Sequence, residues 1–597
     1  MCGIVGYVGD RRASEVILNG LKILEYRGYD SCGISTFDKE LTIRKDMGMI
    51  ETVDESLNFL EMKGSIGIGH TRWATHGAPS KKNAHPHMDC KDEISIVHNG
   101  IISNYSEIKD ELIGKGHEFF SETDSEIIAH LIEELHSDLG LEESVVRAMK
   151  KVKGSYALLA MSAKEPDKIV CIRHESPLLI GLGKDENFLG SDMAAFLDYT
   201  KQVIPLDDME YAVVTKNSYS VKDASTDEVK NKKILSVSWD KQMAQKEGFE
   251  TFMLKEIHEQ PQTIKNALMV YEKDIEKLAK MIDDAKRTYI IGAGTSLNSA
   301  WVSFYWFARL CKTPVIVMDS SEFIEGGICD ENTLVVGITQ SGETYDTLSA
   351  MRHGKNHGAK TACIVNVIGS TATRESDHVI MQNSGIEISV CATKTFTSQI
   401  AILLRIAIKL SKVKRIDSDE LRAVKKELTK IPGYIEKVLQ KTDDIQKIAK
   451  KYFNKTNYIY IGKGISLPTA LEGALKFKEI TYFHAEGMSS GLLKHGTISL
   501  IDDNMITVAV IPSEGENRMR IINNVQEIKA RNGLVICVVS GGSVEQCNVN
   551  ISAPECHELV SPFVLAVVCQ LLAYYTAIHH GRNVDRPRAL AKSVTVG

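Results

Sequence analysis

The sequence predicts an α/β protein, with a layered α+β domain at the N-terminus and two doubly wound parallel-sheet domains after it. The length, the order of the elements and an internal duplication together indicate this fold class. The chain has 597 residues, enough for three or four domains. β-rich runs mix with helical patterns in the first part, whereas strands alternate with helices in a repeated pattern in the second.

The first domain is predicted over residues 2–238. This mixture of strands and helices is typical of a compact layered domain. The polar, charged stretch 239–262 follows, and we interpret it as a linker that runs into a helix. The expected strands of the domain are 3–8, 94–98, 156–161, 169–173 and 211–214, and the expected helices are 13–25, 124–139 and 141–152.

Two further domains are predicted from a duplication. Residues 289–297 match residues 459–467 in two glycines, a serine and a leucine, and each copy has a helical run, an apolar strand, Gly-x-Gly and a helix. Strands that alternate with helices predict a parallel, doubly wound sheet in each copy. The copies are expected at 263–425 and 426–584, with a tail at 585–597; the strands that recur are 333–338 with 506–511, and 361–365 with 533–538.

The Gly-x-Gly pattern after a strand has an alternative interpretation as a dinucleotide site. The third glycine and the distal acidic residue of that fingerprint are missing here. The sequence therefore predicts no nicotinamide or other cofactor.

Composition argues against several classes of protein. The chain is 25% charged with a formal net charge of −7, so no basic face for nucleic acid or an anionic membrane is expected. We expect no apolar stretch of transmembrane length and no secretory leader. The twelve cysteines have no framework spacing, which fits reduced thiols. The sequence thus predicts a cytoplasmic enzyme with no nucleic-acid or membrane partner.

Cys2 is the strongest candidate for chemistry. It follows the initiator Met1, and removal of that residue would leave a thiol and a free α-amine on one amino acid. An α-amine titrates at about 7.7–8.0, so it could accept the proton of a thiol that titrates near about 8.5. This is the logic of an N-terminal nucleophile. The alternative is a cysteine at this position by chance.

Three polar clusters in the first domain fit the chemistry of Cys2. Arg72 lies in a loop, where its guanidinium could hold a carboxylate. Asn99 and Gly100 follow an apolar strand and could form an oxyanion hole. Asp124 opens a helix and could accept from an ammonium group. Taken singly, each has a simpler alternative: a surface ion pair, a β-turn and a helix N-cap, respectively.

Taken in order, these segments resemble the class II glutamine amidotransferase domain. The matching motifs are 2–6, 26–31, 70–77, 98–100 and 123–126. The resemblance implies an N-terminal-nucleophile fold in which Cys2 attacks the glutamine amide and its own α-amine acts as base. It also implies roles for Asn99 and Gly100 at the oxyanion, and a set of glutamine-binding residues: Arg72, Trp73, Thr75, His76 and Asp124.

The run His85-Pro86-His87-Met88-Asp89-Cys90 has side chains of the kind that bind metals. It lacks a second cluster at the spacing of a zinc finger. The sequence therefore favours a loop at the border of the substrate site, and no metal is predicted.

A phosphate site is predicted in the first repeat. The strand at 334–338 runs into Thr339-Gln340-Ser341-Gly342-Glu343-Thr344 and a helix, whose N-terminus and backbone N–H groups favour an anion. Ser296 follows the preceding strand and would lie at the same edge of the sheet. The alternative is ordinary helix capping by Ser and Thr. The second repeat carries Glu514 and Glu516 at the corresponding place, so only the first is expected to bind phosphate.

The second repeat offers groups for proton transfer. Glu472, Lys476 and Glu479 are spaced to share one face of a helix over 468–483, which could equally be a solvated salt-bridge face. His495 lies in a loop and titrates near neutrality. The tail at 585–597 has an alternating apolar pattern, so we expect it to be docked.

These features resemble the paired sugar-isomerase domains of the glutamine–fructose-6-phosphate aminotransferase (isomerising) family. The resemblance covers essentially the whole chain and implies that ammonia from glutamine is passed to fructose 6-phosphate, giving glucosamine 6-phosphate for amino-sugar synthesis. It implies that His495 opens the sugar ring, Lys592 forms a Schiff base and Glu479 moves a proton, with Lys476 nearby. It assigns sugar-phosphate binding to Ser296, Thr339, Gln340, Ser341, Thr344, Val390 and Ala591.

Three positions depart from the family pattern: Thr339 replaces a commoner Ser, Leu492 a Glu and Thr497 a Pro. The resemblance further implies a homodimer in which the partner lends His495, and a shielded ammonia passage bordered by Trp73 and the tail. Two rival functions remain open at this stage. One is an amidotransferase for another ketose phosphate, and the other is a sugar-phosphate sensor without turnover.

Overall fold

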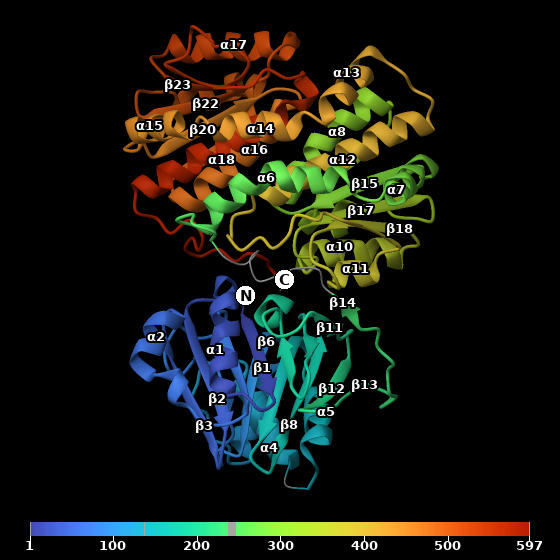
Figure 1. Cartoon of the computed structure of the whole chain (residues 1–597), viewed down its shortest axis with the longest axis vertical. Coiled ribbons are helices and arrows are strands. Elements are labelled where there is room, and N and C mark those ends of the chain that lie inside the picture. The colour runs from blue at the N-terminus through green and yellow to red at the C-terminus, as the bar shows by residue number, and fades with distance from the viewer. Residues whose placement is uncertain (1, 137, 237–245, 596–597) are drawn as a thin grey trace.

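The computed structural model describes residues 2–136, 138–236 and 246–595. An N-terminal domain lies at one end of the molecule and two parallel-sheet domains lie together at the other (Figure 1). Cys2 and the C-terminal tail meet at the junction between the two ends, where both line one cavity. The predicted mixed α/β class is confirmed.

The N-terminal domain has four layers, in which two sheets pack face to face and helices cover their outer sides. Alternate residues of the central strand β1 show the reason: Ile4 and Val8 pack between the sheets, whereas Val5 and Tyr7 pack under helix α1. Helices α4 and α5 cover the other sheet. The layered α+β prediction for this domain is correct.

The elements of this domain are as follows. The eight-stranded sheet has the order β14(Leu235–Ser236), β11(Gln202–Pro205), β9(Leu179–Leu182), β10(Asn187–Gly190), β1(Gly3–Val8), β4(Ile66–Arg72), β2(Ser31–Phe37), β3(Leu41–Met47). The six-stranded sheet has the order β13(Tyr219–Asp223), β12(Glu210–Thr215), β8(Glu165–His174), β7(Gly154–Ser162), β6(Ile94–Ile102), β5(His87–Met88). The helices are α1(Ala13–Leu24), α2(Ile50–Leu57), α3(Tyr105–Gly114), α4(Glu126–His136) and α5(Leu141–Met149).

The duplication predicted from the sequence is confirmed, because each copy has a five-stranded, all-parallel sheet with the same strand order. In both copies the order is second, first, third, fourth, fifth, which is that of a doubly wound sheet. The first copy has the order β16(Ile316–Asp319), β15(Arg287–Gly292), β17(Thr333–Thr339), β18(Lys360–Val365), β19(His378–Met381). The second has the order β21(His484–Ser489), β20(Asn457–Gly462), β22(Met505–Ile511), β23(Leu534–Ser540), β24(Val549–Ala553).

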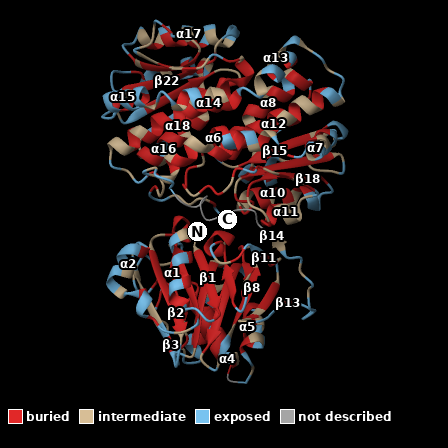
Figure 2. Ribbon diagram, in the orientation of Figure 1, coloured by how far each residue is buried: buried red, intermediate tan, exposed pale blue. Residues whose placement is uncertain are grey.

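Helices join the two copies into one body. The layer between the two sheets includes α8(Thr295–Cys311), α12(Lys394–Val413), α16(Ser466–Thr481) and α18(Ser561–His579), and Figure 2 shows them largely buried. One hydrophobic cluster runs from Met253 to Val584 through both copies. The remaining main helices are α6(Phe252–Leu268), α7(Glu272–Asp284), α10(Tyr345–Asn356), α13(Asp419–Leu428), α14(Ile431–Leu439), α15(Thr442–Tyr452) and α17(Gly515–Lys529).

Helix α18 corrects one expectation from the sequence. The segment Glu558–His579 is long and apolar enough to span a membrane, although no such stretch was expected. Within its most apolar window, 94% of the residues are buried inside the protein. Its apolar character all round therefore reflects a core helix that packs on every side.

Two further findings concern the linker and the cysteines. Helix α6 already begins at Phe252, so the last part of the expected linker at 239–262 is helical, and residues 237–245 lie outside the described residues. Cys537 on β23 is joined to Cys547 by a disulfide, which differs from the expectation that all thiols are reduced.

Candidate active site

Cys2 lies at the start of the central strand β1, beside the end of β4. The register pairs Gly3 with Thr71, so the residue after β4 faces the thiol. The backbone N–H of Trp73 donates to Cys2 Sγ at 3.2 Å. Burial raises the pKa of the Cys2 thiol, and this hydrogen bond acts in the opposite direction. A nearby base is therefore needed to generate the thiolate at neutral pH.

Asn99 and Gly100 lie inside strand β6 rather than in a turn, so the β-turn alternative is wrong. Asn99 pairs with Ala157 on β7, and its Nδ2 donates to Cys2 O at 3.0 Å. Gly100 has φ of +133°, and a Cβ there would lie 2.0 Å from the Ser155 carbonyl oxygen. Only glycine therefore fits beside the Asn99 amide at this point of the strand.

His70 is a positioning residue that the sequence analysis missed. Its Nε2 lies 3.0 Å from Asn99 Oδ1 and 3.0 Å from the His98 carbonyl oxygen, so it donates to both acceptors. Burial lowers the pKa of His70 to about 3, which keeps the ring neutral. This bond fixes which end of the Asn99 amide points toward Cys2. Its signal in the sequence was its place at the start of the 70–77 motif.

Arg72 is the last residue of strand β4 rather than part of a loop; it and Asp124 are buried beside Cys2, so the simple interpretation of Arg72 as a surface ion pair is wrong. Arg72 Nη2 donates to Gly77 O at 3.0 Å, whereas Arg72 Nη1 is buried and makes no hydrogen bond within the described residues. Asp124 Oδ2 accepts from the backbone N–H of Ile102 at 2.8 Å. A buried guanidinium nitrogen without a partner is suited to bind a carboxylate.

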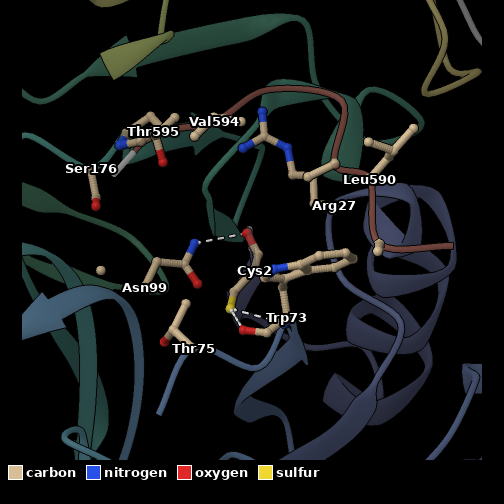
Figure 3. Close-up of a pocket in the computed structure, with 13 residues that line it drawn as sticks. Cys2, Arg27, Trp73, Thr75, Asn99, Ser176, Leu590, Val594 and Thr595 are labelled. Atoms are coloured by element: carbon tan, nitrogen blue, oxygen red, sulfur yellow. Dashed lines mark hydrogen bonds between the residues drawn. The ribbon is translucent and has the colours of Figure 1, made fainter. Parts of the chain in front are cut away.

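A cavity of about 220 Å³ opens beside Cys2. Figure 3 shows Cys2, Trp73, Thr75 and Asn99 on one side of it and the C-terminal tail on the other. Arg72, His76 and Asp124 do not line this cavity. The remaining lining residues are Arg27, Gly100, Ser176, Pro177, Ala589, Leu590, Ala591, Val594 and Thr595.

The predicted phosphate loop lies at the switch point of the first parallel sheet, between β17 and α10. Thr339 Oγ1 accepts from Gly342 N at 3.1 Å and lies 3.1 Å from Thr344 Oγ1. Ser341 Oγ accepts from Glu343 N at 3.1 Å. The backbone carbonyl oxygen of Gln340 accepts from Asn366 N at 3.1 Å. The hydroxyls therefore close the loop locally, at the edge where open α/β sheets bind ligands, and the N-cap residue Thr344 makes no side-chain capping hydrogen bond to α10.

The tail crosses this same loop. Ser593 Oγ lies 2.7 Å from Ser341 Oγ, and Val594 O accepts from Tyr345 N, the first residue of α10, at 2.9 Å. Ser296 follows β15 and accepts from Gln399 Nε2 at 3.1 Å. The tail is thus docked, as the sequence predicts, between the Cys2 cavity and the phosphate loop.

The second copy differs at the equivalent helix. The N-terminus of α17 faces the Glu558 carboxylate, which accepts from Asn517 Nδ2 at 2.8 Å. A Cβ added at Gly515 would lie 3.6 Å from Glu558 Oε2. A fixed anionic side chain at this helix end opposes phosphate binding there.

Lys592 is held by a buried carboxylate that the sequence analysis missed. Its Nζ donates to Glu387 Oε2 at 2.5 Å and to Ser389 O at 2.8 Å. The Lys592 side chain is 4% exposed and the Glu387 side chain 0%. Glu387 also accepts from Thr393 N and Thr395 N. Burial alone would raise the pKa of Glu387, but Lys592 lowers it. The nucleophile of imine formation is a free amine, so Lys592 must give up a proton before it reacts.

Glu472, Lys476 and Glu479 share one face of α16, as predicted, but this is not a solvated face. Lys476 Nζ lies 2.5 Å from Glu479 Oε2, and the side chains of Lys476 and Glu472 are 1% exposed. Glu472 accepts from Thr295 Oγ1 and Asn298 Nδ2 of the first copy. Burial and the Glu479 carboxylate raise the pKa of the Cys391 thiol, which lies near Lys476 and Lys592.

The structure does not bring His495 to these groups. His495 is exposed on the 3₁₀ turn Ser490–His495, which packs against α17 and β21 of the second copy. Val390 is buried, and its N–H donates to Asp585 O at 3.0 Å. Ala591 lines the Cys2 cavity.

Comparisons with known proteins agree with this architecture. A glutamine amidotransferase domain model matches residues 70–198, and a SIS domain model matches 281–409 and 451–580. A glutamine–fructose-6-phosphate aminotransferase [isomerizing] of Methanococcus maripaludis is 53% identical, with 100% of both chains covered. This chain belongs to that family.

Other similar proteins fit the same assignment. A protein of the same name from Thermococcus kodakarensis is 48% identical, again with 100% of each chain covered. The solved C-terminal domain of a glucosamine-fructose-6-phosphate aminotransferase from Francisella tularensis is 33% identical with a TM-score of 0.54. It covers 57% of this chain and 99% of its own. Membership of the family is thus supported over the whole length, and for the C-terminal half by structure.

Proposed function

We propose that this chain transfers the amide nitrogen of glutamine to fructose 6-phosphate and isomerises the product to glucosamine 6-phosphate. In the first half-reaction the C–N bond of the carboxamide breaks, a glutamyl thioester forms and ammonia leaves; water then releases glutamate. In the second, nitrogen replaces the oxygen on C2 of the ketose and a proton moves from C1 to C2. C1 is oxidised while C2 is reduced, so the sugar itself balances the electrons.

On the glutamine side, Cys2 is the nucleophile and its α-amine is the base once Met1 is removed. Asn99 and Gly100 stabilise the oxyanion, and His70 positions the Asn99 amide. Arg72 binds the substrate α-carboxylate through its unpartnered nitrogen. The other glutamine-binding residues proposed are Trp73, Thr75, His76 and Asp124.

On the sugar side, Lys592 gives a proton to Glu387 and forms a Schiff base with C2 with loss of water; ammonia then attacks C2 and the Lys592 amine leaves and regains its proton. Glu479 moves the proton between C1 and C2, and Lys476 holds that carboxylate in place. The phosphate group binds at the loop of the first copy. The residues proposed to contact the sugar phosphate are Ser296, Thr339, Gln340, Ser341, Thr344, Val390 and Ala591.

One observation carries the proposal: a single short segment borders both chemistries. Residues 589–591 line the Cys2 cavity, Lys592 pairs with Glu387, and Ser593 contacts the phosphate loop. Ammonia must stay unprotonated to act as a nucleophile, so a shielded route between the two sites is required for coupling. Trp73 and the tail both line the Cys2 cavity, which supports the proposal that they border such a route.

The assay that tests this function follows two products, glutamate and glucosamine 6-phosphate. We expect Cys2→Ala to lose both products and to keep sugar-phosphate binding in calorimetry. We expect Lys592→Met to keep glutamate release and lose the amino sugar. Cys329→Ala is the control for the loss of a thiol, because Cys329 is half-buried like Cys2 but lies in the first parallel-sheet domain rather than the N-terminal domain. Glutamate release at an undiminished rate from Cys2→Ala would refute the assignment.

The same assay decides between the rival functions. Product formed only from another ketose phosphate would change the acceptor, and binding without turnover would indicate a sensor.

Family membership also supports a cytoplasmic homodimer in which His495 enters the partner's sugar site, and domain boundaries at 238, 262, 425 and 584. Sedimentation of the purified chain tests the dimer. Mixing Lys592→Met with His495→Ala chains and regaining activity would support a shared site.

A further inference from the structure

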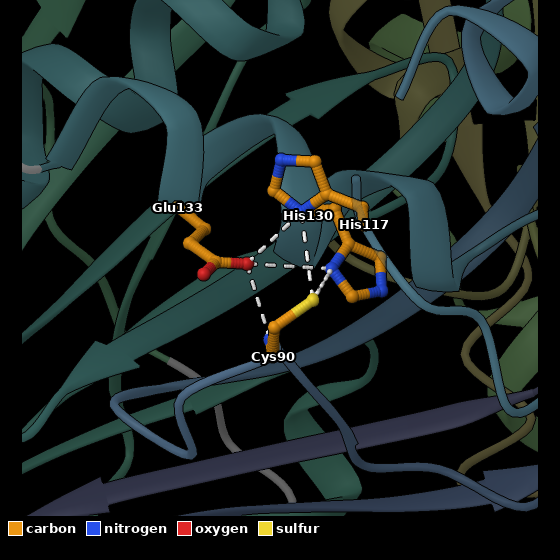
Figure 4. A group of neighbouring side chains, drawn as sticks. All are labelled: Cys90, His117, His130 and Glu133. Carbon is orange, nitrogen blue, oxygen red and sulfur yellow. Dashed lines mark hydrogen bonds and ion pairs between the residues drawn. The ribbon is translucent and has the colours of Figure 1, made fainter. Parts of the chain in front are cut away.

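Four side chains of the N-terminal domain converge at a place that the proposed reaction does not use. Cys90 follows strand β5, His117 lies between α3 and α4, and His130 and Glu133 are three residues apart on α4. Figure 4 shows all four directed toward one another, and their ligand atoms lie within 4.8 Å of one another. His85 and His87, which the sequence analysis considered with Cys90, are not part of this cluster: His87 contacts Thr123 and His85 stacks on His70.

Four of the six distances among these atoms are close to those between ligands around one tetrahedral ion. Cys90 Sγ lies 3.6 Å from His117 Nδ1 and 3.4 Å from His130 Nδ1. Glu133 Oε2 lies 3.1 Å and 3.5 Å from the same two nitrogens. Tetrahedral zinc, with bonds of about 2.3 Å to sulfur and about 2.0–2.1 Å to nitrogen and oxygen, places sulfur and nitrogen about 3.5 Å apart and nitrogen and oxygen about 3.4 Å apart.

Each histidine turns its other nitrogen to a carboxylate outside the cluster. His117 Nε2 lies 3.1 Å from Glu134 Oε1; His130 Nε2 is buried without a hydrogen bond within the described residues, and Glu126 Oε1 lies 3.8 Å from it. Glu126 is itself held by the backbone N–H of Ser121 at 2.7 Å. A carboxylate behind the imidazole is the usual outer shell of a metal-bound histidine, because it fixes the tautomer and the ring orientation.

This orientation makes the cluster unfavourable without a cation. If His117 and His130 carry their protons on Nε2, where the carboxylates lie, both Nδ1 atoms present lone pairs. Those lone pairs face the Glu133 carboxylate, so acceptors face an acceptor there, and the single S–H of Cys90 can donate to only one of them. A positive ion at the centre resolves the conflict. With one thiolate and one carboxylate, a divalent ion makes the site neutral.

We propose that Cys90, His117, His130 and Glu133 bind one zinc ion in a structural site. A thiolate with two imidazoles favours zinc over the hard cations magnesium and calcium. Four protein ligands leave no open position for a substrate, so the ion does not take part in the reaction. Cys90 is exposed whereas the His130 side chain is fully buried, which gives the ion a route in from solvent.

The ion would join three segments that surround the glutamine side of the active site. It would tie the turn after β5 and the α3–α4 connection to helix α4. The segment just before α4 carries Asp124, and Glu126 from the outer shell anchors that same segment through Ser121. Zinc would therefore hold Asp124 in place from behind, at a distance from the reacting atoms.

Metal content of the purified full-length chain tests the proposal without reference to activity. We expect about one zinc per chain by mass spectrometry, and less than about a tenth of that in Cys90→Ser and His117→Asn. Cys329→Ser is the matched control and should keep its zinc, because this half-buried cysteine lies in the first parallel-sheet domain. A wild-type chain that stays metal-free, carries a different metal, or keeps its zinc in Cys90→Ser would overturn the proposal.

A second measurement covers the case in which the variants fail to fold. Wild-type protein is stripped with a chelator and titrated with zinc chloride while the reaction of its thiols with a disulfide reagent is followed. We expect one exposed thiol per chain to become protected at one equivalent of zinc, and cobalt substitution to give sulfur-to-cobalt charge-transfer absorption. Thiol reactivity that is unchanged by zinc refutes the site. If the wild-type chain binds zinc but does not turn over glutamine, the result counts against the proposed function and leaves the zinc site supported.

Discussion

Replacing Glu387 by Gln should uncouple the tail from the first parallel-sheet domain. The carboxylate accepts from Lys592 through one oxygen and from Thr393 N and Thr395 N through the other. The Gln amide has nearly the same shape and keeps an oxygen for the backbone groups. It carries no charge, so the buried Lys592 ammonium loses its counter-ion.

The magnitude follows from burial of the pair. Removing one partner of a buried ion pair costs about 3–5 kcal/mol. We expect a value near the lower end, because Glu256 lies close to Glu387 and can ionise once the Glu387 charge is gone. For a unit as large as the C-terminal half, at about 1–2 °C per kcal/mol, the unfolding midpoint should fall by about 3–6 °C. The double variant Glu387→Gln/Lys592→Met removes both charges of this pair and should recover much of the loss.

The assay combines thermal unfolding with both half-reactions. Glu387→Gln should keep glutamate release and lose most amino-sugar formation, because Lys592 is no longer held at the phosphate loop. Lys592→Met alone should be less stable than the double variant, since it leaves Glu387 buried without its cation. Single variants that are as stable as wild type would refute this account of the pair. So would a double variant whose loss of stability exceeds the sum of the losses in the two single variants.

Two further predictions concern buried titratable groups. His70→Leu should lower glutamine turnover about tenfold or more, whereas His70→Gln, which retains an N–H for Asn99, should keep more of it; equal rates for both would exclude the positioning role. Burial and the Glu387 charge raise the pKa of Glu256 from 4.5 to about 8, so the folded chain binds the extra proton between these values. Stability from this group should therefore fall as pH rises from about 4.5 to about 8, and Glu256→Gln should flatten that part of a melting-temperature profile.

Much of the fold can be predicted from local patterns in the sequence. The repeated strand–Gly-x-Gly–helix pattern predicts both parallel sheets, because a switch from apolar runs to helical periodicity is set by neighbouring residues. The edge at which Ser296 and Thr339 lie follows from parallel topology alone. The expectation of no apolar stretch of transmembrane length overlooked helix α18, which is long and apolar enough to span a membrane but is buried in the core.

The partners of the site residues could not be predicted in the same way. Glu387 lies 205 residues before Lys592, and nothing in its local sequence marks it as the counter-ion. The three residues proposed to bind zinc together with Cys90 lie 27, 40 and 43 residues after it in the chain, beyond the spacing of a zinc finger. The contact of His70 with Asn99 depends on the packing of β4 in one sheet against β6 in the other. Such pairs depend on tertiary packing, which sequence spacing does not encode.

The unbroken apolar interior that spans both repeats limits how the two halves of the duplication can evolve apart. Glu472 of the later copy completes the polar end of α8 in the earlier one, and a single cluster of aliphatic and aromatic side chains fills the space between the sheets. Neither repeat has a surface of its own along that seam. Removing one repeat, or replacing it with the equivalent domain of another protein, would expose apolar helix faces to water. The two repeats should therefore unfold in one step and be inherited as one unit.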